Sequence, residues 1–237
     1  WANGIFAPTV TSDTYTRGAA PAAPVDAGYV VIRAIDPDGA TIGRATAAQT
    51  TVSDTDFKTG TPVCAAGCTH KKLSGVPTLL RYGRLSLGNA NGSELLNLPL
   101  VMRLQYWAGA TQGWQNNAAD TCTLINASDF AFSFPGAGNN LAACETAITL
   151  SGTAPNYIPT LSKPGAGNAG WTDITLNLGA LAAGNRCVAI GAAGPAATTA
   201  NAPWLQFNWT GAVGNPVARA TFGVYKSGPV IHRREMY

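Results

Sequence analysis

Apolar side chains recur at every second position over a long stretch near the middle of the chain. From residue 96 to residue 106 the even positions are apolar, and most of the positions between them are polar. This alternation predicts a strand with one buried face. Because Pro99 has no N–H to give to a β-ladder, the strand is expected to bulge there or to lie at a sheet edge. The apolar positions are Leu96, Leu98, Leu100, Met102, Leu104 and Tyr106.

Similar short apolar alternations occur along the rest of the chain, separated by turn residues such as the Asp-Pro-Asp-Gly of 36–39 and the Asn-Ala-Asn-Gly of 89–92. Regular short strands with such turns predict an all-β fold of antiparallel β-sandwiches. No window carries the helical period over three turns, so helices are limited to about one turn, with 141–146 the candidate. The predicted strands centre on residues 29–35, 130–134, 174–178 and 205–209.

Two units are predicted from changes in composition. The region 58–75 carries a close cysteine pair and two adjacent lysines, which favours a boundary near residue 75. Residues 1–75 would then form a small immunoglobulin-like β unit and residues 76–237 a larger C-terminal sandwich. A single continuous domain is the alternative, because 237 residues suit either organisation. At the end of the chain, 216–225 and 230–237 predict a hairpin that closes a longer polypeptide.

Charge and hydropathy argue against two classes of partner. Only 11% of the residues are charged, the formal net charge is +3, and the basic residues are mostly scattered. Nucleic-acid binding would need a basic stripe interleaved with aromatic residues, so no nucleic-acid partner is expected. No apolar stretch approaches the length of a membrane-spanning helix, so no membrane insertion of this segment is expected.

The chain has five cysteines, whose pairing indicates the cellular compartment of the protein. The spacing favours disulfides between Cys64 and Cys68 and between Cys122 and Cys144. Cys187 could replace either partner in the second of these pairs, because spacing does not fix connectivity. Disulfides belong to oxidising environments, so an extracellular or cell-surface location is expected.

No catalytic, cofactor or metal site is predicted. The chain has two histidines and no Gly-x-Ser-x-Gly turn, so a hydrolase triad is not expected. The Cys64–Cys68 spacing and the following His70 fit neither haem attachment nor a complete zinc site, and a tight disulfide loop is the simpler interpretation. The calcium candidates, which lack the further oxygen ligands of a full loop, are Asp36, Asp38, Asp54 and Asp56.

Tryptophan is the residue type with the clearest binding potential, because aromatic planes suit sugar rings. Trp107 and Trp209 fit inward positions or strand ends and are expected in the core. Trp114 lies among Gly, Gln and Asn residues and is expected to be exposed, so Trp114, Asn116 and Asn117 are the predicted glycan contacts.

Several segments between residues 81 and 237 also carry a family resemblance. In order and spacing they resemble the C-terminal region of the MshQ family of MSHA (mannose-sensitive haemagglutinin) pilus biogenesis proteins. The resemblance implies an extracellular, pilus-associated protein. The segments are Arg-Tyr-Gly-Arg-Leu (81–85), Gly-Ser-Glu-Leu-Leu-Asn-Leu-Pro (92–99), Gln-Tyr-Trp (105–107), Asp-Thr-Cys-Thr (120–123), Pro-Trp-Leu-Gln-Phe-Asn-Trp (203–209) and Ala-Thr-Phe-Gly-Val-Tyr (220–225).

Together these features predict a non-enzymatic structural or assembly module of a pilus-associated or cell-surface protein. Its expected partners are other subunits of a surface filament or pilus, including further copies of itself. Strand addition at an open sheet edge is one available mode of contact. The alternative is a glycan-binding adhesin domain that uses Trp114 and the neighbouring amides.

Overall fold

The computed structural model describes residues 17–28, 31–33, 70–72, 78–136, 139–191 and 194–223. The chain divides into two compact units, Trp1–Tyr82 and Gly83–Tyr237. The predicted boundary near residue 75 lies outside the described residues. So do Cys64, Cys68 and the second strand of the predicted C-terminal hairpin.

The described part of the first unit consists of two antiparallel strand pairs, β1 with β4 and β2 with β3. The hydroxyl of Tyr82 donates to the backbone oxygen of Ala19 at 3.1 Å, and the guanidinium of Arg17 lies 4.5 Å from the Tyr82 ring centroid. The immunoglobulin-like arrangement of this unit stays a prediction. The strands are β1 (Val25–Gly28), β2 (Val31–Arg33), β3 (His70–Lys72) and β4 (Thr78–Leu80).

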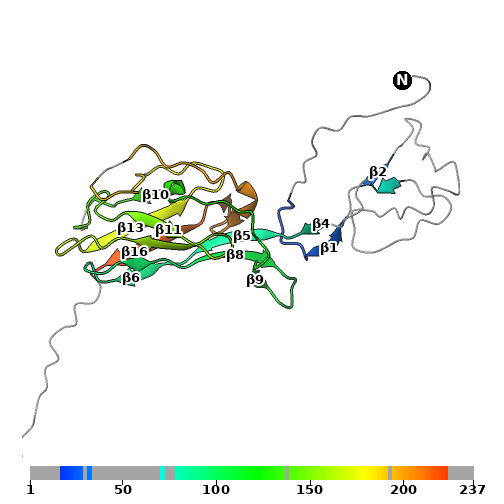
Figure 1. Ribbon diagram of the computed structural model, residues 1–237, viewed down its shortest axis with the longest axis horizontal. Coiled ribbons are helices and arrows are strands. Elements are labelled where there is room, and N and C mark those ends of the chain that lie inside the picture. The colour runs from blue at the N-terminus through cyan, green and yellow to red at the C-terminus, as the bar shows by residue number, and fades with distance from the viewer. Residues whose placement is uncertain are drawn as a thin grey trace, which may run out of the picture. The chain divides into compact units, whose positions relative to one another are not determined.

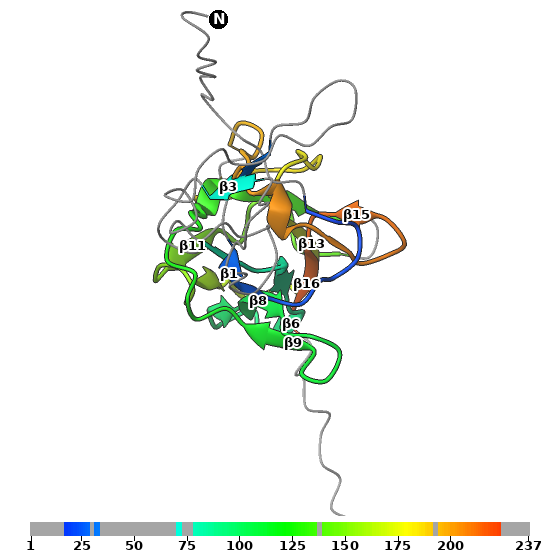
Figure 2. The same cartoon turned by 90° about the vertical axis from the view of Figure 1, so that its right-hand side faces the viewer.

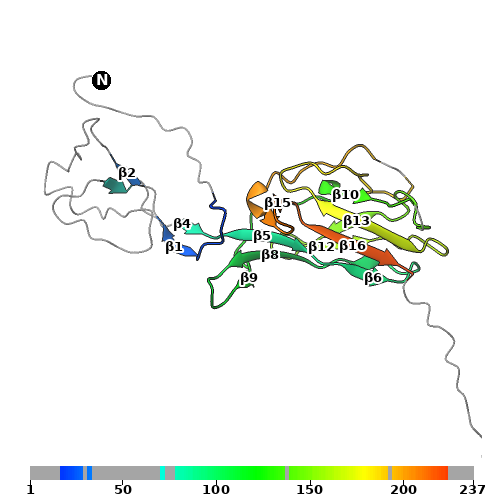
Figure 3. The ribbon, with the colours of Figure 1, turned by 180° about the vertical axis from the view of Figure 1, so that it is seen from behind.

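The described part of the second unit forms three main sheets and a short two-stranded ribbon (Figures 1 and 3). We call them the β13 sheet (β10-β13-β16-β6), the β12 sheet (β11-β12-β7), the β8 sheet (β5-β8-β9) and the β14–β15 ribbon. The strands are β5 (Gly83–Leu87), β6 (Ala90–Gly92), β7 (Leu98–Pro99), β8 (Met102–Trp107), β9 (Trp114–Asn116), β10 (Phe130–Ser133), β11 (Ile148–Ser151), β12 (Ile158–Leu161), β13 (Gly170–Leu176), β14 (Phe207–Asn208), β15 (Val213–Gly214) and β16 (Val217–Phe222).

The predicted all-β fold with antiparallel sheets is confirmed. One described pair departs from the pattern, because β6 runs parallel to β16 at the edge of the β13 sheet. The described helices are single 3-10 turns, η2 (Ala127–Asp129) and η3 (Pro203–Leu205). The helical turn proposed for 141–146 is wrong, since these residues form turns and bends. None of the described helices has the length and hydropathy to cross a membrane.

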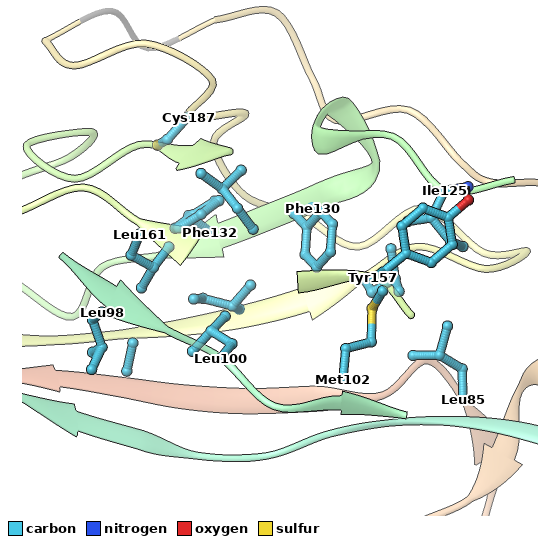
Figure 4. Close-up of a cluster of buried hydrophobic side chains, with 14 of the residues drawn as sticks. Leu85, Leu98, Leu100, Met102, Ile125, Phe130, Phe132, Tyr157, Leu161 and Cys187 are labelled. Atoms are coloured by element: carbon cyan, nitrogen blue, oxygen red, sulfur yellow. Dashed lines mark hydrogen bonds between the residues drawn. The ribbon is translucent and has the colours of Figure 1, made fainter. Parts of the chain in front are cut away.

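Buried side chains from all three main sheets meet in one hydrophobic core (Figure 4). In the β13 sheet, Phe132 on β10 pairs with Ile174 on β13, which in turn pairs with Ala218 on β16. All three are at most 1% exposed. The β8 and β12 sheets add Leu85, Leu104 and Leu161 among others. The period-two patterns at 130–134 and 174–178 therefore mark inward faces, as predicted.

The long alternation from 96 to 106 is divided between two sheets. Leu98 and Pro99 form β7, the edge strand of the β12 sheet, which confirms the edge position expected for Pro99. After two residues outside any strand, β8 begins at Met102, and burial at even positions continues through Leu104. Leu96 is 67% exposed, contrary to its predicted inward position. It lies in a turn, where its N–H donates to the carbonyl oxygen of Ser93.

A long segment after β13 covers the free edge of the β13 sheet. Asn185 exchanges two backbone hydrogen bonds with Phe132 of β10, at 2.8 and 2.9 Å. Gly184 has a φ of +150°, and a Cβ atom built there would lie 2.6 Å from the Phe132 carbonyl oxygen, so only glycine permits this approach. Pairing of this kind shields the N–H and C=O groups that an open edge strand would present.

Asn177 fastens the same segment and gives a stability prediction. Its side chain is fully buried, donates to the Thr198 carbonyl oxygen at 3.0 Å and accepts from the Ala182 N–H at 3.0 Å. Asn177→Ala is expected to lower the free energy of unfolding by about 2–4 kcal/mol, because it removes a fully buried side chain together with both of these hydrogen bonds. Urea unfolding measures the loss, and Asn140→Ala, at an exposed position, is the control. A loss below about 1 kcal/mol would contradict this role.

Candidate functional site

The solvent-facing side of the β8 sheet carries an unusual set of side chains. Since Leu85, Met102 and Leu104 point into the core, the residues that alternate with them lie on the outer face. The cross-strand register aligns Arg84, Gln105 and Asn116 in one row and pairs Trp107 with Trp114 beside it. The outer-face residues are Arg84, Ser86, Arg103, Gln105, Trp107, Trp114 and Asn116, none of which is acidic.

Arg84 is surrounded by aromatic rings. Its Cζ atom lies 3.9 Å from the ring centroid of Trp114 and 5.1 Å from those of Phe207 and Trp209. Phe207 begins β14 and Trp209 follows it, so the β14–β15 ribbon supplies these two rings to the β8 sheet. A guanidinium at these distances interacts favourably with an aromatic face, by about 0.5–2 kcal/mol depending on solvent exposure.

The aromatic rings contact one another edge to face. The centroid distances are 5.5 Å for Trp107–Trp114, 5.0 Å for Trp114–Phe207 and 5.3 Å for Phe207–Trp209, with interplanar angles between 65° and 79°. This geometry is favoured for aromatic pairs. We call Arg84, Trp107, Trp114, Phe207 and Trp209 the arginine–aromatic cluster.

The guanidinium of Arg84 is hydrogen-bonded to a neutral side chain. Its Nε donates to Gln105 Oε1 at 3.0 Å, and no carboxylate among the described residues forms an ion pair with it. Partial burial lowers the pKa of Arg84 from its ordinary value, because desolvation disfavours the charged form. An arginine keeps its proton nonetheless. The cluster therefore presents a positive charge in a partly desolvated aromatic setting.

The β13 sheet has a second arginine–tryptophan pair, in which the guanidinium is hydrogen-bonded to a carboxylate instead of an amide. Arg219 lies 5.9 Å from the Trp171 centroid, and its Nε and Nη2 donate to the two carboxylate oxygens of Asp173 at 2.7 and 2.8 Å. The hydrogen bond and charge of Asp173 raise the pKa of Arg219. Arg219 therefore has the carboxylate partner that Arg84 lacks among the described residues.

A groove of about 490 Å³ adjoins the outer face and shares Arg103 and Asn116 with it. On its other side it is bounded by residues 155–158, which precede and begin β12. Its size falls in the range of small-ligand sites. An extended ligand on the outer face could thus continue into the groove.

The predicted glycan contacts lie in or next to this region, with one correction. Trp114 is half-buried within the cluster rather than exposed, because Arg84 and the neighbouring rings cover it. Asn116 is exposed on the outer face. Asn117 is half-buried just after β9, and its N–H donates to the Leu104 carbonyl oxygen at 2.8 Å.

Two other aromatic predictions need correction, and the main cation was missed. Trp209 was expected in the core but is 38% exposed, since β14 is only two residues long and the chain leaves the sheet there. Trp107, also expected inside, is half-buried on the outer face. Arg84 was not predicted as a site residue. Its alternation with buried Leu85 in 83–87 was the available signal.

The predicted pairing of Cys122 with Cys144 is wrong. Cys144 is bonded to Cys187, the alternative that the spacing left open, and Cys122 is a free, exposed cysteine. Backbone hydrogen bonds from Ile148 N–H to the Cys187 oxygen and from Gly191 N–H to the Cys144 oxygen flank the disulfide. These contacts bring the two segments together, whereas Cys122 lies on the surface beside Asp120.

The metal and cysteine predictions in the first unit fall outside the described residues. This applies to the calcium candidates Asp36, Asp38, Asp54 and Asp56, and to the Cys64–Cys68 pair. Within the described ranges, no group of three or more His, Cys, Asp or Glu side chains could hold a metal ion.

Fold and surface together define a disulfide-containing, all-β sandwich domain whose β8 sheet carries arginine and tryptophan side chains. Figure 2 labels β8 and β9 of this sheet in a view turned by 90° from Figure 1. The chain belongs to the DUF6701 family, since residues 81–236 match the model of its fourth domain. This family is found in large bacterial surface proteins. Among curated proteins and among solved structures, none matches the chain significantly.

Proposed function

We propose that this chain is a non-enzymatic, extracellular module of a pilus-associated surface protein and that it acts through contacts with other subunits. Membership of a family found in large bacterial surface proteins supports the setting. The disulfide between Cys144 and Cys187 supports an oxidising compartment. The sequence resemblance to MshQ supports the link to a pilus.

The arginine–aromatic cluster is the observation that carries the contact role. Tryptophan and arginine are the residue types most enriched among the side chains that dominate binding energy at protein interfaces. Here two tryptophans and an arginine share one sheet face, and Trp209 stands 38% exposed at its margin. Aromatic residues held rigidly by neighbouring rings lose little conformational entropy on binding. The outer face of the β8 sheet is therefore the proposed contact surface.

Pilus purification from the producing bacterium tests this proposal. The parent protein is expected to co-purify with pili, and Trp209→Ala is expected to reduce the recovered amount about tenfold, as loss of an interface anchor does. Trp171→Ala, on the outer side of the β13 sheet, is the matched control and should leave recovery unchanged. A protein that stays monomeric at all concentrations and never appears with pili would contradict the assembly role.

Glycan binding at the same face is the second candidate. The row of Arg84, Gln105 and Asn116 offers hydrogen-bonding groups next to aromatic rings, a combination suited to hydroxyl-rich rings with an apolar side. A glycan array with the wild-type chain and Trp114→Ala separates the candidates. Binding that the substitution abolishes supports the glycan role. No bound sugar, or equal binding after the substitution, eliminates it.

A further inference from the structure

We propose that Arg84 binds the carboxylate of an acidic sugar, a uronate or a sialate, with the aromatic rings beside it contacting the sugar ring. This inference rests on the glycan-binding candidate function and names its ligand class. Its centre is the outer face of the β8 sheet, where Arg84 lies in one row with Gln105 and Asn116.

The orientation of the Arg84 guanidinium leaves one edge for a ligand. Its Cζ lies 3.9 Å from the Trp114 centroid, and its Nε is occupied by Gln105. Among the described residues, the two Nη groups donate to no acceptor. A guanidinium presents parallel N–H groups that match the two oxygens of a carboxylate. The group is therefore fixed in place with its binding edge unused.

Arg219 shows what a completed version of this arrangement looks like in the same unit. There, Asp173 fills the guanidinium edge with two hydrogen bonds of 2.7 and 2.8 Å beside a tryptophan. At Arg84 the aromatic surroundings are more extensive, with three rings within 5.1 Å of Cζ, and the carboxylate is missing. An external carboxylate would supply the same interaction.

The charge of the face favours an anion over a neutral or cationic ligand. Arg103 adds a second guanidinium, and the outer positions of β5, β8 and β9 contain no Asp or Glu. A face with one sign of charge raises the local concentration of the opposite charge. Aromatic cover around Arg84 reduces competition by water, which strengthens a charge-assisted hydrogen bond.

The remaining groups suit a saccharide. The partly exposed ring of Trp209 can contact the apolar side of a pyranose, and the Asn116 amide can hydrogen-bond to hydroxyls. The adjoining groove of about 490 Å³, which shares Arg103 and Asn116, has room for a further sugar unit. These features distinguish the proposed ligand from a free carboxylate such as acetate.

Two matched ligand pairs test the charge requirement with the full 237-residue chain. One pair is trigalacturonate and its methyl ester, and the other is sialyllactose and lactose. Isothermal titration calorimetry is expected to show binding of at least one acidic member, about tenfold or more tighter than its neutral counterpart. The two pairs also distinguish uronate from sialate as the source of the carboxylate.

Arg84→Lys tests whether the two parallel N–H groups of the guanidinium are needed, because lysine keeps the positive charge and lacks these paired donors. It is expected to weaken binding of the acidic sugar about tenfold and so to remove most of the preference for the acidic member of the pair over its neutral counterpart. Arg219→Lys, at the arginine already bonded to Asp173, is the control and should bind like wild type. Near-UV circular dichroism shows whether each variant keeps its aromatic packing.

The results of these experiments distinguish the role of Arg84 in binding a carboxylate from glycan binding in general. Equal affinity for the acidic and neutral members of both pairs, or undiminished binding by Arg84→Lys, overturns the role of Arg84 while the glycan function stands. Failure of the wild type to bind any glycan, on the array and in calorimetry, overturns both. Binding of acidic peptides but no sugar also overturns the inference and supports a protein contact.

Discussion

Removing the Cys144–Cys187 disulfide by the double substitution Cys144→Ala/Cys187→Ala is expected to lower the free energy of unfolding by about 4 kcal/mol. The bond joins residues separated by 43 positions, and the closed loop contains β11, β12 and β13. Without it, the unfolded chain regains the conformations that closing such a loop removes. Both cysteines are also fully buried, so the bond fills space in the core.

Urea unfolding of oxidised wild type, reduced wild type and the double variant measures this effect. Reduction should reproduce much of the loss, since it breaks the same covalent link. Cys122→Ser is the control, because Cys122 is exposed and unbonded, and its free energy of unfolding should stay within about 0.5 kcal/mol of wild type. A double variant as stable as the control would show that the bond does not constrain the fold.

The inward faces of the strands could be predicted because they depend on local alternation alone. Phe130 and Phe132, and likewise Ile174 and Leu176, are buried as the period of two requires. The ends of the strands were harder to predict, because the hydrogen-bond partners of a strand determine where it begins and ends. Leu96 continues the apolar pattern but lies in a turn, and the pattern itself does not indicate that β7 and β8 belong to different sheets.

The candidate site shows the same division between local and long-range information. Trp114 and Asn116 were predicted from their neighbours in the sequence, and both lie on the outer face of the β8 sheet. Arg84, Phe207 and Trp209 join them only through the pairing of β5 with β8 and the position of the β14–β15 ribbon. The cysteine pairing failed for the same reason, since Cys187 comes close to Cys144 through tertiary contacts.

Phe132→Ala is expected to lower the free energy of unfolding by about 3–5 kcal/mol, as other large-to-small substitutions of buried aromatic residues do. Phe132 is fully buried on the inward face of β10, the edge strand of the β13 sheet that the Asn185 segment covers. The alanine would lose both the transfer free energy of the ring and the contacts of a close-packed interior. Its backbone also anchors Asn185 of the covering segment.

Urea unfolding followed by tryptophan fluorescence measures this loss, with Phe134→Ala as the matched control. Phe134 stacks on Phe132 at a centroid distance of 6.1 Å but is only half-buried, so its substitution should cost about half as much or less. Phe132→Leu, which keeps most of the apolar volume, should cost about 1.5 kcal/mol or less. Equal losses at the two positions would contradict the proposed contribution of Phe132 to the core, because complete burial is what distinguishes it from the neighbouring ring.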